Sequence, residues 1–151
     1  MSSPPPVVVF PDAELVAVTL LRAALEAGTV IGTEWPPGLE EKLEDGVVSV
    51  TRGGGAEIQR YVTEDVTLDV DVLAATKKQA HDLAQLVRAH LRAAEGSMLS
   101  APGSTVDRTQ IYTVADVSLI WLPYSPDAET APIPRYVLVM QMRLRARPAV
   151  P

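Results

Sequence analysis

Two secondary-structure patterns follow each other directly in residues 66–94, VTLDVDVLAATKKQAHDLAQLVRAHLRAA. In the first, apolar and polar residues alternate with a period of two, which predicts a strand with one buried face and one acidic face. The apolar positions are Val66, Leu68, Val70 and Val72, and the polar positions are Thr67, Asp69 and Asp71. In the second, Thr76 and Gln79 match a helix capping box. The predicted helix that follows carries an apolar stripe and runs to about Ala94.

Weaker signals on both sides of this block predict one more helix and three more strands. Asp12 is a suitable N-cap for a helix over about residues 13–27, and Gly28 is placed to end it. β-Branched or alternating residues predict strands over residues 47–52, 112–122 and 135–147. Between the last two strands, residues 123–134 contain four prolines and predict a long connection.

The order helix, strand, strand, helix, strand, strand predicts an α+β fold. We expect a single-layer mixed or antiparallel sheet of about four to five strands, with two α-helices packed on one face. The strands over residues 47–52 and 66–73 are expected to be neighbours. The same holds for the strands over residues 112–122 and 135–147. The predicted domain organisation is an extended proline-rich arm over residues 1–11, a single domain over residues 12–147 and a short tail over residues 148–151.

The composition is that of a folded chain with little catalytic equipment. Hydrophobic residues make up 47% of the sequence and charged residues 21%, as in ordinary globular proteins. The absence of cysteine excludes disulfides, thiolate catalysis and cysteine-ligated metal sites, and two histidines are too few for a three-histidine zinc site. No apolar stretch approaches the ~18–20 residues of a membrane span, and the first residues do not match a secretory signal. We therefore expect a cytosolic protein that does not contact membranes.

Charge is unevenly distributed along the chain. Residues 1–75 carry 13 acidic and 4 basic side chains, whereas residues 76–151 carry 6 acidic and 9 basic ones. The net charge of −6 argues against binding nucleic acid by counterion release over the whole surface. Opposite charges on the two halves favour contacts between copies or with partners, unless folding mixes the two halves.

No catalytic or metal-binding constellation stands out in the sequence. His81 and His90 are nine residues apart on one predicted helix and therefore point to opposite sides. Asp69 and Asp71 form an Asp-X-Asp motif on one strand face. No nucleotide-binding glycine pattern precedes this motif, so an acidic strand face is favoured over a Mg²⁺ site. No G-x-S-x-G motif surrounds a serine. We therefore predict no enzyme activity, no cofactor and no metal.

Arginines on the last predicted strand are candidate contact residues. Arg143, Arg145 and Arg147 alternate and so share one face of that strand. One interpretation pairs them with Asp69 and Asp71 across a single sheet, and another pairs them with the acidic face of a second subunit. Nucleic acid is less favoured, because few aromatic residues are available to stack on bases.

The block over residues 66–94 resembles the core of tail terminator proteins from long-tailed, siphovirus-type bacteriophages, particularly phages of actinobacteria. The features that carry the resemblance are the acidic alternating strand, the Ala-Ala-Thr turn and the alanine-rich helix. An acid-capped first helix, a glycine-rich loop over residues 52–55 and a long basic last strand agree with that family. The similarity spans about residues 10–147 in the order of elements, and it is specific in residues 66–94.

The resemblance implies a structural virion protein rather than an enzyme. It implies a mixed sheet covered by two helices, and a homo-oligomer, usually a hexameric ring, on the end of the completed tail tube. Such a ring stops further addition of the major tail tube protein and presents a surface to the head–tail connector or adaptor. DNA passes through the ring without specific binding. The implied location is the tail–neck region of the virion, and the host cytoplasm during assembly.

Within this interpretation, three groups of residues are candidates for contacts. The candidate subunit interface consists of Arg143, Arg145, Arg147, Asp69 and Asp71. The loops over residues 53–63 and 96–110 are candidates for binding the tube or the connector. Their candidate residues are Gly53, Gly54 and Gly55, which we expect to form a flexible loop tip, together with Arg60 and Arg108. The candidate acidic lining of the channel, which would repel DNA, consists of Glu40, Glu41, Glu44 and Asp45.

Two other functions stay open on the sequence alone. The nearer one is another head–tail joining protein, such as a neck adaptor or completion protein between the connector and the terminator. The more distant one is a small metal-dependent enzyme that uses Asp69 and Asp71.

Overall fold

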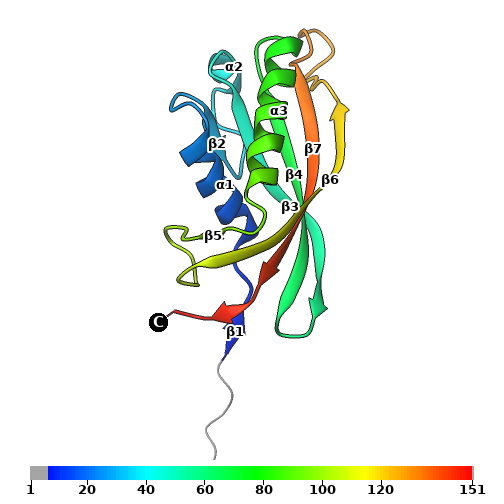
Figure 1. The fold of residues 1–151 in the computed structure, drawn as a ribbon. Helices are drawn as coiled ribbons and strands as arrows, with labels where there is room; N and C mark the ends of the chain where they lie inside the picture. Colours follow the sequence, from blue (N-terminus) through cyan, green and yellow to red (C-terminus); the bar gives the residue numbers. More distant parts are fainter. Residues whose placement is uncertain (1–6, 151) are drawn as a thin grey trace, which may run out of the picture.

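A computed structural model describes residues 7–150 of the chain, and its main element is a six-stranded sheet (Figure 1). The strands of this sheet lie in the order β2-β3-β4-β7-β6-β5, and a separate two-stranded sheet joins β1 to β8. The strands are β1 (Val8–Val9), β2 (Val30–Gly32), β3 (Val47–Gln59), β4 (Thr63–Leu73), β5 (Met98–Leu99), β6 (Thr109–Trp121), β7 (Arg135–Arg145) and β8 (Arg147–Pro148). The helices are α1 (Ala13–Ala24), α2 (Leu39–Lys42) and α3 (Lys77–Ala93).

The six-stranded sheet is built around its two central strands, β4 and β7. β4 pairs antiparallel with β3 on one side and with β7 on the other, and β7 pairs antiparallel with β6. The pairings of β3 with β4 and of β6 with β7 confirm the neighbours predicted from the sequence. β2 runs parallel to β3 and β5 antiparallel to β6, each over a short stretch. The long strands twist and curl, so that the sheet bends into an open half-barrel (Figure 1).

The helices α1 and α3 pack on the same face of the sheet, and their N-caps match the sequence signals. The carboxylate of Asp12 accepts a hydrogen bond from the N–H of Leu15 at 3.1 Å. The hydroxyl of Thr76 accepts one from the N–H of Gln79 at 3.2 Å, as the capping box predicts. α1 ends before the predicted stop at Gly28. No helix in the described part of the chain is long and apolar enough to cross a membrane.

The main hydrophobic core lies between the sheet and these two helices. Alternate residues of the central strands point into it and are fully buried: Val66, Leu68, Val70, Val72, Leu138, Met140, Met142 and Leu144. The helices add Val16, Ala17, Leu21, Ala84, Val87 and Leu91. Burying one large aliphatic side chain stabilises a fold by about 1.5–3 kcal/mol relative to leaving it exposed. The core therefore determines which face of each central strand is internal.

The opposite face of the sheet, called the outer face below, is covered at one end. There, Val47, Leu73 and Ile133 form a second buried cluster against Trp35 and Tyr124. The rings of Trp35 and Tyr124 meet edge to face with their centroids 4.7 Å apart. The cover consists of the segment before α2 and the proline-rich connection between β6 and β7. The remainder of the outer face carries the acidic side of β4.

The predicted fold class, a single sheet of about four to five strands with two helices, is wrong. Residues 7–150 form eight strands in two sheets and three helices, in a mixed α+β fold. The additional strands β1, β2, β5 and β8 have two or three residues each, and α2 has four. Elements this short show no readable periodicity, because a repeat of two or about 3.6 residues needs a longer window to appear. Their existence depends on pairing with distant parts of the chain.

The two ends of the described chain pair with each other. Val8 and Val9 of β1 lie antiparallel to Arg147 and Pro148 of β8. Residues 1–6 of the predicted N-terminal arm lie outside the described residues. Because β8 follows directly on β7, this pairing places the start of the chain beside the end of the sheet from which β3 and β4 project (Figure 1).

Gly53, Gly54 and Gly55 lie within strand β3, so the predicted flexible loop tip is wrong. β3 runs through all three glycines, and its connection to β4 consists of residues 60–62. The ladder between the two strands continues on both sides of the glycines and shifts register by a bulge among them. Glycine weakens an isolated strand, which is why the sequence favours a loop, but pairing with β4 along its whole length overrides that preference.

Two of these glycines lie close to β4, and one of them, Gly55, is required because its neighbours there are backbone atoms. A Cβ at Gly53 would overlap the carboxylate of Asp69, and a Cβ at Gly55 would overlap the carbonyl oxygen of Asp65. Gly55 also has a φ of 134°, which side-chain-bearing residues rarely adopt. The glycines therefore allow two strands to approach closely rather than allowing the chain to move.

We predict that Gly55→Ala destabilises the protein by about 1–3 kcal/mol, because it introduces both a steric overlap and a strained φ. Gly54→Ala is the matched control, since a Cβ at Gly54 meets nothing within 4 Å. It should be neutral, or stabilising by up to about 1 kcal/mol. Urea unfolding of both variants measures the difference, and equal stabilities would contradict a packing role for Gly55.

Candidate functional site

The far halves of β3 and β4 form an arm, residues 51–65, that projects from the body of the protein (Figure 1). Every residue of β3 from Thr51 onward is exposed. Where the arm turns, Tyr61 adopts a left-handed φ of 62°. The side chains of Ile58 and Tyr61 are 56% and 61% exposed. The tip of the arm therefore presents two large apolar side chains to solvent.

Polar contacts join the two strands of the arm to each other and join the arm to α1. The guanidinium of Arg52 donates to both carboxylate oxygens of Glu64, at 3.3 and 3.0 Å. The side chain of Glu64 is only 7% exposed, so this ion pair is largely shielded from water. The backbone N–H of Arg52 donates to the carboxylate of Glu14 on α1 at 2.7 Å. The ion pair therefore ties the two strands of the arm together, and the contact with Glu14 ties the arm to α1.

On the outer face, Arg143 pairs within the chain but not with the predicted carboxylates. Its guanidinium donates to both carboxylate oxygens of Asp65, the residue opposite it on β4, at 2.8 and 3.0 Å. Hydrogen bonding to Asp65 raises the pKa of Arg143. Asp69 and Asp71 lie further along β4, where the register places valines of β7 opposite them. The interpretation that pairs Arg143, Arg145 and Arg147 with Asp69 and Asp71 within the sheet is therefore wrong.

Arg145 and Arg147 bind different partners within the chain. Arg145 is exposed on β7 and donates to the hydroxyl of Tyr112 at 2.9 Å. Arg147 belongs to β8, and its guanidinium donates to the carboxylate of Asp107 at 2.9 Å. Arg108 approaches the same carboxylate at 3.8 Å. The hydrogen bond from Arg147 lowers the pKa of Asp107, so this pair fastens β8 to the connection between β5 and β6.

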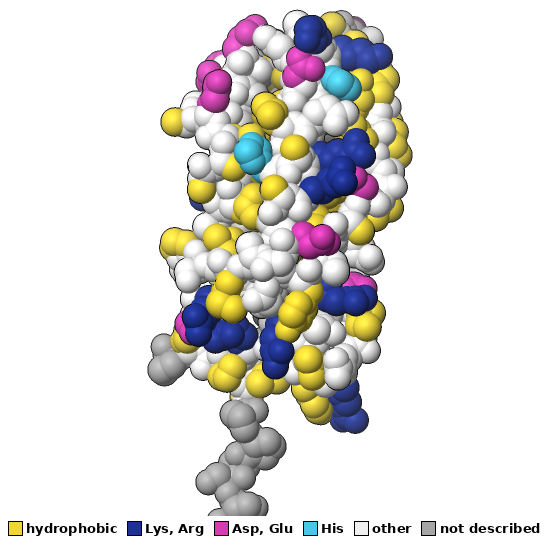
Figure 2. All heavy atoms as spheres, viewed as in Figure 1, with side chains coloured by type: hydrophobic (Ala, Val, Ile, Leu, Met, Phe, Trp, Pro, Cys, Tyr) yellow, Lys and Arg dark blue, Asp and Glu magenta, His cyan; other side chains and the backbone are white. Residues whose placement is uncertain are grey.

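The acidic run predicted to line a channel lies at the end of the molecule opposite the arm. Glu40 and Glu41 belong to α2, Glu44 and Asp45 follow it, and all four are exposed. None of them takes part in the ion pairs found among residues 7–150. Figure 2 shows acidic side chains over α2, and basic side chains both near that end and toward the arm. The end that carries α2 therefore presents the exposed acidic run, and basic side chains are spread over both ends.

A groove opens beside this acidic run, between the end of α1, the turn after α2 and the first half of α3. Its volume is about 270 Å³. Its lining combines leucines with carboxylates, chiefly Leu25, Leu83, Leu86, Glu26, Glu44 and Asp45. Leu86 is 52% exposed although it is a large apolar residue on a regular helix. The groove therefore offers an apolar floor with an acidic rim.

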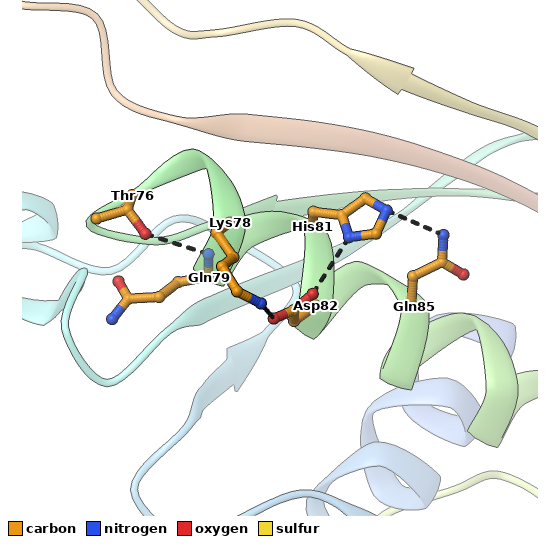
Figure 3. Close-up of polar contacts among 6 residues, drawn as sticks. All are labelled: Thr76, Lys78, Gln79, His81, Asp82 and Gln85. Carbon is orange, nitrogen blue, oxygen red and sulfur yellow. Dashed lines mark hydrogen bonds and ion pairs between the residues drawn. The ribbon is translucent and has the colours of Figure 1, made fainter.

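A network of exposed polar side chains occupies the first turns of α3, next to the groove (Figure 3). Lys78 donates to the carboxylate of Asp82 at 2.7 Å, and the Nδ1 atom of His81 lies 3.2 Å from the same carboxylate. These hydrogen bonds lower the pKa of Asp82, and the contact with Asp82 raises the pKa of Lys78. Lys78 therefore neutralises Asp82, which itself lines the groove, and among the described residues it makes no ion pair with the lining carboxylates of Glu26, Glu44 and Asp45.

Asp69 and Asp71, the Asp-X-Asp motif, are not joined by further metal ligands. Among residues 7–150, no group of three or more His, Asp or Glu side chains could hold a metal ion. Asp71 accepts a hydrogen bond from the indole N–H of Trp35 at 3.0 Å and lies 4.0 Å from Arg135. These contacts tie the central strand to the cover at one end of the outer face.

The sequence reasoning missed both the arm and the groove. For the arm, one signal was present: Ala56 and Ile58 alternate with Glu57 and Gln59, a period of two that the preceding glycines obscure. For the groove, no signal was available, because its lining comes from three separate segments. No protein-family model and no curated protein matches this chain. The arm, the groove and the exposed acidic run are therefore the structural features that bear on function.

We predict that Arg52→Leu destabilises the protein by about 1–3 kcal/mol, because it leaves the shielded carboxylate of Glu64 without its partner. The double variant Arg52→Leu with Glu64→Leu should be more stable than the single variant, since no buried charge remains. Arg88→Leu is the control, because its pair with Asp116 is more exposed and is worth at most about 1 kcal/mol. Urea unfolding distinguishes these cases. A double variant no more stable than Arg52→Leu would refute the shielded ion pair.

The pair of Asp107 with Arg147 predicts a specific pH response. Because the pKa of Asp107 is lowered from 3.8, the pair stabilises the fold above that value, and the contribution disappears as the pH falls below it. In Arg147→Gln, the pKa of Asp107 should rise toward 3.8, and the low-pH loss of β8 pairing should vanish. Arg108→Gln should have the smaller effect. NMR titration of the Asp107 carboxyl carbon measures its pKa in the wild type and in the two variants. An unchanged pKa of Asp107 in Arg147→Gln would contradict the pairing of Asp107 with Arg147.

Proposed function

We propose that the chain is a structural virion protein, the tail terminator of a long-tailed bacteriophage. Copies of it form a ring that caps the tail tube, stops polymerisation of the tube and provides a surface for attachment of the head. Two things support this proposal. The first is the resemblance of residues 66–94 to tail terminator proteins. The second, which carries the structural argument, is the projecting arm.

The arm has the properties of an assembly element. Its β3 side is exposed from Thr51 onward and Ile58 and Tyr61 are exposed near its turn, yet Arg52 holds it through Glu64 on β4 and Glu14 on α1. Such contacts lower the entropy that must be lost when the tip is immobilised in a complex. An arm that is held in this way and has an apolar tip suits a contact with a neighbouring protein in an ordered structure.

One edge of the sheet supports the same proposal. β6 pairs with β7 on one side, but on its other side it pairs with β5 only at Thr109 and Gln110. Exposed apolar side chains occur on and after this strand, at Val117, Ile120 and Leu122. An open strand edge with apolar side chains is a surface that proteins usually protect, because it pairs readily with other chains. In the proposed ring, a neighbouring subunit, the tube or the connector covers this edge.

The distribution of charge suits a ring through which DNA passes without being bound. Arg143 and Arg147 are each paired with a carboxylate of the same chain, which reduces their attraction for phosphate. Glu40 and Glu41 are exposed and would repel DNA wherever they face it. We assign these two glutamates to the wall of the channel. The connection between β5 and β6, which contains Arg108, remains the candidate contact with the tube or the connector.

Tail tubes polymerised from the major tail tube protein of the same phage provide the test. When the chain is added at the start of polymerisation, the tubes should become shorter as its concentration rises. Electron micrographs of finished tubes should show the chain at one end, and native mass spectrometry of the released cap should give a hexamer. Bovine serum albumin at the same concentration is the control for non-specific crowding.

Tubes of unchanged length with bare ends would contradict the terminator function. Binding to the purified head connector without binding to tube ends would instead assign the chain to the neck as an adaptor.

A further inference from the structure

We infer that the tip of the arm of one copy docks in the groove of the next copy, so that subunits join head to tail. This inference rests on the proposed function in one respect, because both require a homo-oligomer, and it names the contact that builds that oligomer. The arm and the groove lie at opposite ends of the molecule (Figure 1), so one copy cannot make the contact with itself.

The arm tip and the groove both present apolar side chains, and the volume of the groove suits the side chains of the tip. At the tip, Ile58 and Tyr61 are mostly exposed, and in the groove Leu86 is exposed beside the partly buried Leu25 and Leu83. Docking would remove all of these side chains from water. The groove, at about 270 Å³, is smaller than the ~300–1,000 Å³ of typical small-molecule pockets. It suits one or two large side chains inserted from a protruding element.

Arg60 in the turn of the arm and the carboxylates of the groove rim are complementary in charge, although the exposed Glu57 of the arm has the same sign as the rim. Among the described residues, Arg60 has no carboxylate within ion-pair distance, and its guanidinium donates only to the hydroxyl of Tyr61 at 3.0 Å. The rim of the groove carries Glu44 and Asp45, which also lack a basic partner in the described part of the chain. An arginine brought to two carboxylates in a partly dry groove forms charge-assisted hydrogen bonds. Complementary charge also selects this orientation over tip-to-tip or groove-to-groove contacts.

The two lysines at the start of α3 make contacts other than with Glu44 and Asp45. Lys78 is paired with Asp82 at 2.7 Å (Figure 3), and the ammonium of Lys77 lies over the ring of Trp121, 4.6 Å from its centroid. Glu44 and Asp45 are therefore left without a basic partner among the described residues. The exposed Arg60 in the turn of the arm supplies the cation.

A contact between two different surfaces is heterologous, and this determines what it can build. Repeated contacts close into a ring when the rotation between neighbours divides a full turn, and otherwise they extend into a filament. The docking divides the acidic run into two parts. Glu44 and Asp45 line the groove, whereas Glu40 and Glu41 line a separate hollow between α2 and the proline-rich connection. The latter pair stays free for the channel wall.

Two double variants and their mixture test this contact. The arm variant carries Ile58→Ser and Arg60→Glu, and the groove variant carries Glu44→Lys and Leu86→Gln. All four side chains are exposed, so both variants should fold, which far-UV circular dichroism checks. Glu129→Lys, an exposed charge reversal outside the groove, is the control. Native mass spectrometry over a concentration series reports the assembly state.

We expect the wild type and Glu129→Lys to form a closed oligomer, and each double variant alone to be monomeric. An equimolar mixture of the two double variants should give a dimer and nothing larger. The reason is that the intact arm of the groove variant fits the intact groove of the arm variant, whereas the other two surfaces of that pair are disabled. An open filament in the wild type that both double variants abolish would also support the contact, while arguing against a ring.

Three outcomes would overturn the inference. Oligomers that persist in both double variants would exclude the contact and leave the ring itself standing. A mixture that stays monomeric would show that the arm and the groove do not bind each other. A wild type that is monomeric at every concentration would also exclude the contact between the arm and the groove. The terminator function would then be tested separately, by the length of tail tubes grown with the chain.

Discussion

Strand β4 is paired along its whole length on both sides, and four of its side chains are fully buried beneath α1 and α3. A shift of its register by one residue would turn Val66, Leu68, Val70 and Val72 toward water and bury the acidic positions. The free energy lost by exposing the apolar side chains and burying the acidic ones fixes the register of β4 relative to β3 and β7. The rest of the sheet is built outward from these three strands, and the curl of the sheet provides the concave side that the two helices fill (Figure 1).

The same alternation decides the chemistry of the outer face. Because the core takes every second residue of β4, the acidic residues between them must face outward, where each has a different surrounding. Asp65 meets Arg143, Asp71 meets Trp35, and Asp69 lies over Gly53. Among residues 7–150, no buried side-chain nitrogen or oxygen lacks a hydrogen-bond partner. On the outer face, Asp65 and Asp71 are thus held by contacts within the chain, and the arm and the groove lie at the two ends of the molecule.

Those two ends differ in shape. One end is an arm that continues the ladder of β3 and β4 beyond the core, and the other is a hollow where two helices and a turn meet. A protrusion with an arginine and a hollow with unpaired carboxylates, separated by the length of the molecule, favour directional association over symmetric pairing. Directional association is what a ring-forming subunit requires, and the proposed function and the proposed contact are consistent with each other on this point.

The sequence by itself determined the parts of the structure that depend on neighbouring residues. Helix caps at Asp12 and Thr76, the alternating strand β4 and the adjacent pairs of long strands are local or strongly periodic, and the structure contains them. Only the tertiary structure decided the four short strands, the extended path of the glycines through β3, and the choice of Asp65 rather than Asp69 or Asp71 for Arg143. These features depend on register between strands that are distant in sequence. The groove also depends on the tertiary structure, because its walls come from separate segments that lie together only in the folded protein.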